Sequence, residues 1–337
     1  MGAMPEPLPL AMTLGDPAGC GPQIAEAAWA QCAEHDLAPF YLIAPPGMLP
    51  GKVQSQAIAS PEQAANVFPS ALPVFELPLT VPRPTPGTPN TATAPAITGS
   101  IETAVAHVMA GKARAVVTNP ISKKLLYDTG FKFPGHTEFL AELAAQPDEL
   151  PPRPVMMLVG GGLRVALATI HMPLREAVDA LTTPSLIEIG RIVHQAMVDN
   201  FRIEQPRLAF TGLNPHAGEE GTLGREEIEI INPAADELRR MGVEICNARP
   251  ADTVFGESLA GRFDAVIAMT HDQGLIPVKT LDIWGGVNTT LGLPFVRTSP
   301  DHGTAYDAAR DGTARPDSLI AALKLADDMT QQRTANG

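Results

Sequence analysis

Basic residues are scarce in this 337-residue chain, and so are cysteines and long apolar runs. It has 24 Lys and Arg against 37 Asp and Glu, for a net charge of −13. This leaves no surplus of positive charge to neutralise nucleic-acid phosphates or to bind an anionic membrane surface. We therefore expect no nucleic-acid partner and no membrane partner.

Cys20, Cys32 and Cys246 are far apart and form no CxxC pair, which argues against a disulfide framework and a cysteine zinc site. No segment reaches the roughly 20 apolar residues of a membrane-spanning helix. The N-terminal residues show no basic segment followed by an unbroken apolar one, so no signal peptide is predicted. A cytoplasmic location is expected.

Apolar runs of strand length alternate with stretches of helical spacing, which favours an α/β fold with a mostly parallel sheet and helices on both faces. The glycines at 160–162 predict a hairpin between two of the strands. The proline-rich stretch 72–95 is predicted to be a surface connection, because proline disfavours both helices and central strands. Strands are predicted at 8–14, 40–44, 113–118, 155–159, 163–169, 207–211, 243–246 and 265–269, and helices at 24–32, 100–110, 137–145, 185–200 and 226–241.

Three histidines follow predicted strands, where α/β proteins bind ligands. His171, His216 and His271 would together offer imidazoles to one divalent ion and leave room for water or substrate. The alternative is that each histidine only hydrogen-bonds backbone. Asp252 and Asp272 could ligate the ion, orient an imidazole or accept a proton, and each is also a plausible turn or cap residue.

A second set of residues suits a small anionic substrate. His136 and Thr137 open an amphipathic helix, whose N-terminus attracts anions, although Thr137 alone could be an N-cap. Lys279, Asn288 and Arg297 are predicted on loops rich in Gly and Thr, and they add two cations and an amide. Taken singly, each could equally be a solvated surface residue.

No GxGxxG motif is present, since Gly19 and Gly21 are followed by Pro22 and the third glycine is missing. The motifs after the strands, however, closely resemble those of the 4-hydroxythreonine-4-phosphate dehydrogenase family of pyridoxal phosphate biosynthesis. The resemblance runs from about Leu8 to about Ala326 and is weakest in the proline-rich stretch. It rests on TLGDPAGCGPQIA, TNPISKK, PGHTEFLAEL, LATIHMPL, LNPHAGEEGTLGREE, PADTVF, HDQGLIPVK and GVNTTLGLPFVRTSPDHGTA.

The resemblance implies NAD(P)-dependent oxidation of 4-phosphooxy-L-threonine to 2-amino-3-oxo-4-phosphooxybutanoate, which loses CO₂ to give 3-amino-2-oxopropyl phosphate. It implies a homodimer with the site at the subunit interface, where the partner contributes two of the histidines. Zinc is the metal it implies, with magnesium or cobalt as substitutes. The proton acceptor stays open among Asp252, Asp272 and metal-bound water. By matching motif, the metal ligands are His171, His216 and His271, with Asp252 nearby, and the substrate contacts are His136, Thr137, Lys279, Asn288 and Arg297.

GDPAGCGP and DHGTAYDAARDGTARP are more distantly similar to segments of isocitrate and isopropylmalate dehydrogenases, where the second segment forms the cofactor loop. Arg310 stands where that loop usually has glycine. The similarity implies two α/β/α domains around a central cleft: residues 1–140 with 300–337, carrying the cofactor loop, and residues 141–299, carrying the metal site and dimer interface. The implied nicotinamide-cofactor residues are His302, Gly303, Thr304 and Asp307.

Other functions remain open at this point. Relatives use the same scaffold on 4-phospho-D-threonate or on a cis-dihydrodiol of an aromatic dicarboxylate. A three-histidine site could also support metal-assisted hydrolysis, which would need no nicotinamide. The remaining alternative is a non-catalytic metal-binding or interaction protein, which the number of polar groups at strand ends disfavours.

Overall fold

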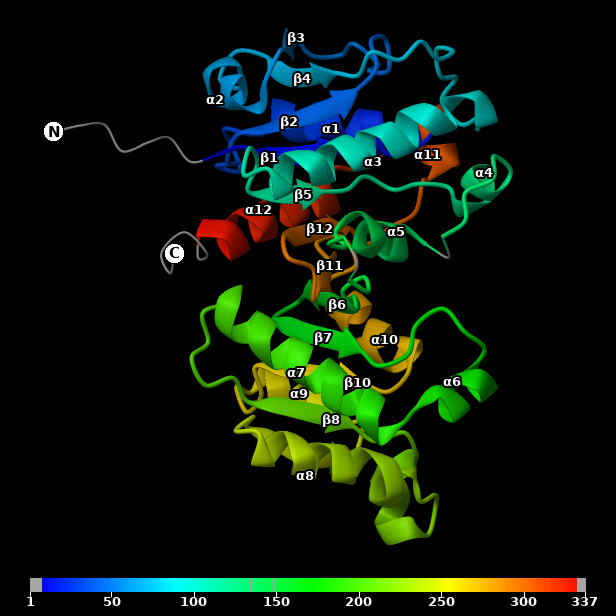
Figure 1. Cartoon of the computed structure of the whole chain (residues 1–337), viewed down its shortest axis with the longest axis vertical. Coiled ribbons are helices and arrows are strands. Elements are labelled where there is room, and N and C mark those ends of the chain that lie inside the picture. Colours follow the sequence, from blue (N-terminus) through cyan, green and yellow to red (C-terminus); the bar gives the residue numbers. More distant parts are fainter. Residues whose placement is uncertain (1–7, 134, 148, 332–337) are drawn as a thin grey trace, which may run out of the picture. The chain divides into compact units, whose positions relative to one another are not determined.

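The computed structural model describes residues 8–133, 135–147 and 149–331. The chain divides into two compact units (Figure 1). Unit 1 consists of the described residues up to Arg153 together with Leu293–Thr330, and unit 2 of Pro154–Gly292. Unit 1 is therefore built from two separate stretches of chain.

Unit 1 contains a parallel sheet whose strands lie in the order β3-β4-β2-β1-β5-β12. Its central strands are continuous apolar runs, because both faces of a parallel sheet are buried beneath helices. The strands are β1 (Leu10–Thr13), β2 (Phe40–Ala44), β3 (Ser55–Ile58), β4 (Leu72–Glu76), β5 (Ala115–Val117) and β12 (Val296–Pro300).

The long helix α3 (Ala94–Met109) covers one face of this sheet. Ile97, Ile101 and Ala104 lie four or three residues apart on that helix and pack with Tyr41 and Val116 of the strands in one buried cluster. The other helices of unit 1 are α1 (Gly21–Ala30), α2 (Ala64–Val67), α4 (Lys123–Tyr127), α5 (His136–Leu143), α11 (Tyr306–Asp311) and α12 (Asp317–Gln331), with short 3₁₀ turns η1 (Pro61–Gln63) and η2 (Thr91–Thr93).

The prediction for the proline-rich stretch is wrong at both ends. Its last two residues, Ala94 and Pro95, begin helix α3. Its first five form β4, a strand lying between β2 and β3. Pro73 is tolerated there since it lies at the start of the strand. Pairing with β2 begins only at Val74, so no ladder donor is lost on that side. On the other side, the Leu72 N–H donates to Gln54 O (2.9 Å).

Unit 2 contains a mixed sheet in the order β11-β6-β7-β10-β8-β9. β6 is antiparallel to both of its neighbours, and β7, β10, β8 and β9 are parallel. The β6–β7 hairpin confirms the prediction from the three glycines, two of which have positive φ at the turn. The strands are β6 (Val155–Gly160), β7 (Leu163–Leu167), β8 (Leu208–Thr211), β9 (Ile245–Arg249), β10 (Ala265–Ala268) and β11 (Val287–Leu291).

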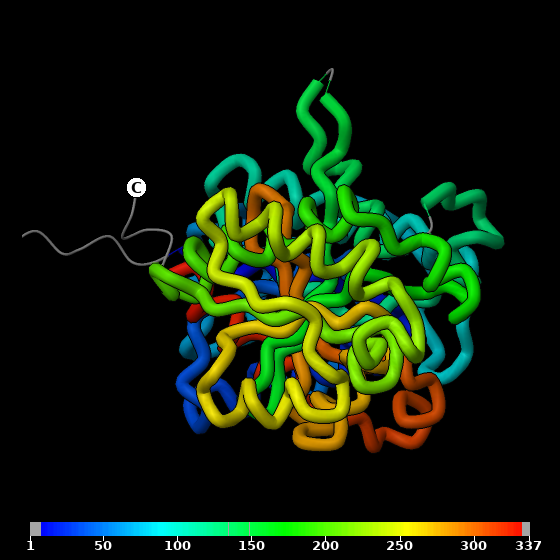
Figure 2. Tube along the Cα trace, turned by 90° about the horizontal axis from the view of Figure 1, so that it is seen from below, coloured from blue at the N-terminus to red at the C-terminus, as the bar shows by residue number. Residues whose placement is uncertain are grey.

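Helices cover both faces of the unit 2 sheet. Successive residues of its strands point to opposite faces and pack in two different hydrophobic clusters, each of which includes a helix. Ala166 and Ile267 pack in the cluster that includes α7 and α8, whereas Val165 and Ala268 pack with Val278 of α10. Figure 2 shows α8, β9 and α9 covering one end of the unit in yellow-green to yellow. The helices are α6 (Leu174–Ala180), α7 (Thr183–Asp199), α8 (Asn232–Arg240), α9 (Val254–Leu259) and α10 (His271–Leu281), with η3 (Pro215–Gly221) and η4 (Glu227–Ile231).

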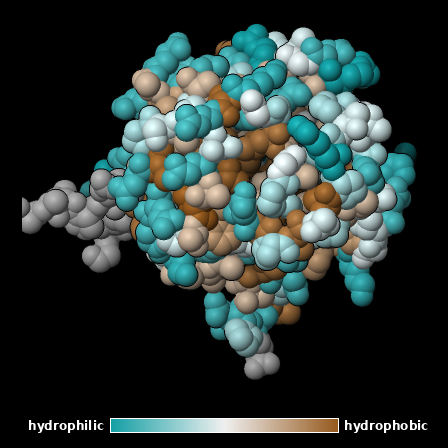
Figure 3. All heavy atoms as spheres, turned by 90° about the horizontal axis from the view of Figure 1, so that it is seen from above, coloured by the Kyte–Doolittle hydropathy of each residue, from teal (hydrophilic) through white to brown (hydrophobic). Residues whose placement is uncertain are grey.

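The structure confirms the α/β class. Each predicted strand and helix overlaps an observed one. The strand predicted at 40–44 has the observed bounds, and the bounds of the others are shifted. Among the residues that the structure describes, no helix is both long and apolar enough to cross a membrane. The face of the molecule in Figure 3 is largely hydrophilic, with apolar residues gathered around a hollow near its centre.

Candidate functional site

Neighbouring parallel strands bring His171 and His271 together. β7 and β10 pair in parallel, with Leu167 opposite Ala268, so the segments that follow the two strands leave the sheet side by side. The Thr169 hydroxyl extends this connection by donating to Met269 O (2.8 Å). The two imidazole rings lie with their centroids 5.6 Å apart and their planes tilted by 48°.

A capping box fixes His271 as the first residue of α10. The Thr270 hydroxyl accepts from the N–H of Gln273, and the Gln273 side chain accepts from the Thr270 N–H (3.1 Å). The Gln273 amide also donates to Gly212 O (3.0 Å), at the end of β8. Gln273 therefore connects the start of α10 to the neighbouring strand and restricts where His271 can lie.

Asp272 orients the His271 ring. Its carboxylate lies 2.8 Å from His271 Nδ1, an arrangement that favours a proton on Nδ1 and leaves Nε2 as the nitrogen to bind a metal. A cavity of about 470 Å³ lies beside the two histidines. Apart from its histidines and a few polar residues, it is lined by apolar side chains: Ile170, Met172, Leu174, Ala177 and Ile276.

His216 lies in an unusual backbone segment. Residues 216–220 of η3 have φ between 42° and 78°, which makes them a left-handed turn. Four of the five are not glycine, and each such residue costs about 1–2 kcal/mol in this region. Strain of this kind persists only where surrounding contacts hold it, and it gathers at functional sites. Apart from Gly218, nothing in the residue pattern indicates this turn.

The side chains around the histidine pair supply some, but not all, of the ligands that a divalent metal would need. Two imidazoles lie close enough to approach one ion, and a carboxylate orients one of them. Within the described part of a single chain, however, no three His, Cys, Asp or Glu side chains gather as a metal site. The prediction that His216 joins the other two therefore stays a prediction, as does a role for Asp252, which is exposed before α9.

In unit 1, cationic groups gather at the start of α5. The Arg297 guanidinium is buried and donates to the Thr118 hydroxyl through Nη2 (2.7 Å) and Nε (3.1 Å). Burial lowers the pKa of Arg297 to about 10. Burial also lowers the pKa of His136 well below its ordinary value, and the charges of Arg297 and Lys123 lower it further. This corner is positive, with a neutral imidazole.

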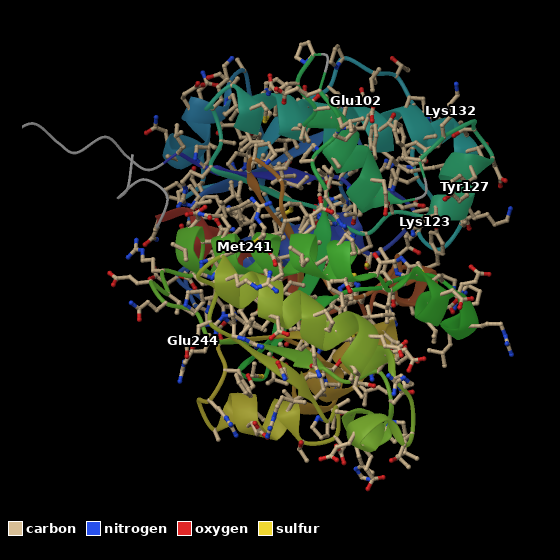
Figure 4. All side chains as sticks on the ribbon, turned by 60° about the horizontal axis from the view of Figure 1, so that its bottom comes forward. Glu102, Lys123, Tyr127, Lys132, Met241 and Glu244 are labelled. Atoms are coloured by element: carbon tan, nitrogen blue, oxygen red, sulfur yellow. The ribbon has the colours of Figure 1, made fainter. Side chains whose placement is uncertain are left out.

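His136 Nε2 in this corner is shielded from solvent and has no hydrogen-bond partner among the described residues. A Cβ on Gly135 would lie 2.6 Å from Glu138 Oε2 and 3.1 Å from Lys123 Nζ, so a carboxylate and the lysine both approach the helix start closely. Figure 4 shows Lys123 and Tyr127 on α4. An anion at the start of α5 would meet His136, backbone N–H groups and these cations, which is chemistry suited to a phosphate.

Two predictions about these residues are wrong. Lys279, Asn288 and Arg297 do not lie on loops: they lie on α10, β11 and β12, respectively. Thr137 is not an N-cap, because Gly135 is the N-cap of α5 and Thr137 lies within the first turn. The predicted roles of these residues in substrate binding are not affected by either correction.

The predicted cofactor segment lies against the loop after β1. Cys20 N–H donates to Thr304 O (2.8 Å), and a Cβ on Gly19 would lie 2.7 Å from that same oxygen. The Tyr306 hydroxyl donates to the buried Asp16 carboxylate (2.5 Å), and burial together with this carboxylate raises the pKa of Tyr306 to about 12. His302 and Gly303 are exposed.

Arg310 lies within the right-handed helix α11 and pairs with Asp307 (2.9 Å). The positive φ values nearby belong to Ala305 (46°) and Gly312 (68°), so the backbone at Arg310 does not require glycine.

Sequence reasoning assigned no role to Gln273 or Lys123. The spacing of Thr270 and Gln273 is a capping-box pattern that could have indicated both the helix and the role of Gln273. Lys123 lies in the TNPISKK motif, but only the fold brings it to the start of α5.

Both units thus place polar groups at the carboxyl ends of parallel strands, the edge where open α/β sheets bind ligands. That arrangement defines the class as an α/β protein with binding groups at the carboxyl edge of the sheet in each unit. The sequence profile described as "Pyridoxal phosphate biosynthetic protein PdxA" matches residues 32–326. The chain belongs to this family.

Relatives of known name support this assignment. The 4-hydroxythreonine-4-phosphate dehydrogenase of Caulobacter vibrioides is 50% identical over 329 residues, covering 96% of this chain and 98% of the relative. The crystal structure of the enzyme of that name from Klebsiella pneumoniae has a TM-score of 0.85 at 35% identity and covers 96% of this chain and 100% of its own. A terephthalate 1,2-cis-dihydrodiol dehydrogenase from Burkholderia xenovorans has a TM-score of 0.65 at 28% identity, covering 95% and 98%.

Proposed function

We propose that this chain is a metal-dependent NAD(P) dehydrogenase that oxidises 4-phosphooxy-L-threonine at C3. The product, 2-amino-3-oxo-4-phosphooxybutanoate, then loses CO₂ to give 3-amino-2-oxopropyl phosphate. The observation that carries the proposal is the His171–His271 pair beside the Asp272 carboxylate, in a chain half identical to enzymes named for this activity.

His171, His216 and His271 would hold a divalent ion, zinc first and magnesium or cobalt as substitutes. Such an ion, when bound, acts as a Lewis acid that lowers the pKa of an alcohol and stabilises negative charge on oxygen. Asp272 keeps the His271 ring in the tautomer that can bind the ion. Either Asp272 or Asp252 accepts the proton of the hydroxyl, directly or through water.

His136, Thr137, Lys279, Asn288 and Arg297 bind the substrate, and the positive corner of unit 1 supports a phosphate there. His136 is neutral at pH 7 because its pKa is lowered, so it can donate a hydrogen bond without holding a second charge in this corner. Binding the phosphate supplies free energy at a distance from the reacting carbon. His302, Gly303, Thr304 and Asp307 would hold the nicotinamide cofactor, which when bound would supply a hydride acceptor for the oxidation.

A homodimer is the proposed assembly, with histidines of two chains completing each metal site. Its support is the apolar surface around the histidine pair. Leu174 is 69% exposed and Ile276 is 63% exposed, and both line the cavity beside His171 and His271. Exposed apolar side chains that lie around one cavity favour an interaction surface there.

The decisive experiment is a substrate panel with NAD⁺ and with NADP⁺, before and after removal of metal by a chelator. We expect reduced cofactor to form with 4-phosphooxy-L-threonine, to fall on chelation and to return with zinc. 4-Phospho-D-threonate and an aromatic cis-dihydrodiol acid are the competing substrates, the second because of the Burkholderia xenovorans relative. Turnover without nicotinamide would instead indicate a hydrolase.

His171→Ala tests the metal ligands, with His35→Ala as the matched control, since His35 lies outside these motifs after α1. We expect His171→Ala to lose zinc and most of kcat while remaining folded. Wild-type zinc content and kcat in His171→Ala would refute the proposed ligand set.

A further inference from the structure

Glu227 is a buried carboxylate with no role in the reaction as proposed above. It is the first residue of η4 and is 2% exposed. Burying a charged carboxylate is costly unless hydrogen bonds compensate it. The hydrogen bonds of the Glu227 carboxylate therefore indicate its role in the structure.

The carboxylate of Glu227 hydrogen-bonds to the segment that leads into His216. Its Oε1 accepts the backbone N–H groups of Leu213 and Asn214, both at 2.8 Å. Its Oε2 accepts from the side-chain amide of Asn214 (3.0 Å). These three donors fix the backbone between the end of β8 and the left-handed turn.

Two glycines make room for this carboxylate, because a side chain at either position would come too close to it or to the turn. A Cβ on Gly218, inside the left-handed turn, would lie 2.6 Å from Glu227 Oε2. A Cβ on Gly212, before it, would lie 3.2 Å from Oε1 and 2.8 Å from the Cα of Ala217. The turn is thus packed directly on the carboxylate.

We infer that Glu227 is the positioning residue for His216: its carboxylate holds the left-handed turn so that the imidazole is presented for metal binding. This inference rests on the proposed metal site. The side chain must be a carboxylate, because glutamine would put a donor opposite the Asn214 amide, which already donates to Glu226 (2.7 Å). Loss of the negative charge also weakens both backbone hydrogen bonds.

The test is zinc binding by metal-free protein, measured in competition with a chromogenic chelator, together with the visible spectrum of the Co²⁺-loaded protein. Partners that orient a ligand typically change metal affinity 10- to 100-fold. We therefore expect Glu227→Gln to bind zinc roughly 10- to 100-fold more weakly than wild type. Glu229→Gln is the matched control: it removes the same charge from an exposed side chain of η4 that pairs with Arg225, and we expect wild-type affinity.

A double-mutant cycle separates positioning from a general structural role. If Glu227 acts through His216, Glu227→Gln will cause no further loss of zinc affinity in a His216→Ala background, and its Co²⁺ spectrum will differ from that of wild type. Equal losses in both backgrounds, or wild-type affinity in Glu227→Gln, would overturn the inference. If Glu227→Gln fails to fold by circular dichroism, Asn214→Ala, which removes one donor to the carboxylate, replaces it in the cycle.

The same titrations distinguish failure of this inference from failure of the proposed function. Zinc binding that depends on His171 and His271 but not on Glu227 would overturn only the positioning role. A wild-type protein that binds no zinc, or binds it equally well as His171→Ala, would remove the metal site and this inference together.

Discussion

At one exposed glutamate, a glycine variant should be more stable than the alanine variant. At another, the glycine variant should be less stable. Glu219 lies in the left-handed turn with φ 42° and ψ 61°, and Glu102 is exposed in the middle of the right-handed helix α3 (Figure 4). Replacing each by Ala and by Gly removes the same charge in all four variants. The difference between Gly and Ala at one position then reports the backbone alone.

The two differences have opposite signs. At 219, alanine pays about 1–2 kcal/mol for its left-handed backbone conformation, and glycine does not. Glycine costs about 0.5–1 kcal/mol because it has more conformational entropy in the unfolded state. The difference leaves the glycine variant more stable by about 1 kcal/mol. At 102, alanine is the better helix former by about 1 kcal/mol. For units of this size, 1 kcal/mol shifts Tm by roughly 2–4 °C. Glu219→Gly should therefore melt roughly 2–4 °C above Glu219→Ala, and Glu102→Gly about as far below Glu102→Ala.

Differential scanning calorimetry of the four variants at one pH and salt concentration gives these differences directly. Far-UV circular dichroism confirms that each variant is folded. If Glu219→Gly melts below Glu219→Ala, residue 219 is not in the left-handed region in solution. The strain argument for the His216 segment would then be wrong.

Three further predictions concern unit 1. Arg297→Ala should raise KM for the phosphorylated substrate roughly 10- to 100-fold, because a hydrogen bond to a charged group contributes about 1.5–3 kcal/mol. If steady-state kinetics show an unchanged KM, Arg297 does not bind the substrate. The pKa of His136 is lowered in the folded state, so the unfolded chain takes up a proton at higher pH than the folded chain does. The free energy of unfolding should therefore fall as pH drops below about 6.5, by up to about 1.4 kcal/mol per pH unit. Urea unfolding of His136→Gln should show a smaller fall than wild type, and an equal fall would contradict this. Tyr306→Phe, which loses the donor to Asp16, should raise KM for the nicotinamide cofactor more than KM for the substrate, and the reverse order would place the cofactor elsewhere.

Strong local patterns made much of the fold predictable. The strand at 40–44 matches β2 residue for residue, because five apolar side chains in a row have no other stable place than the interior of a parallel sheet. The β6–β7 hairpin was predictable because its glycines lie where the turn requires positive φ. The helix α10 was missed because Gly274 and Pro277 disguise it, although its capping box was present.

The candidate site was predictable only as a set of motifs. The closeness of His171 and His271 depends on which strands are neighbours, and residue spacing along the chain does not carry that information. The left-handed turn at His216 escaped prediction for a related reason. Its backbone is held by Glu227, a residue eleven positions later, rather than by the preferences of its own residues.

The division of unit 1 into two stretches of chain has a consequence for how the molecule is made. A ribosome completes all of Pro154–Gly292 before it releases β12, the strand that pairs with β5 through Val296 and Ala115. During synthesis the β5 edge of the unit 1 sheet therefore stays unpaired, and can pair with a wrong strand, until about the last eighth of the chain emerges. The salt bridge between Arg114 and Asp327 then joins the early segment to the late one.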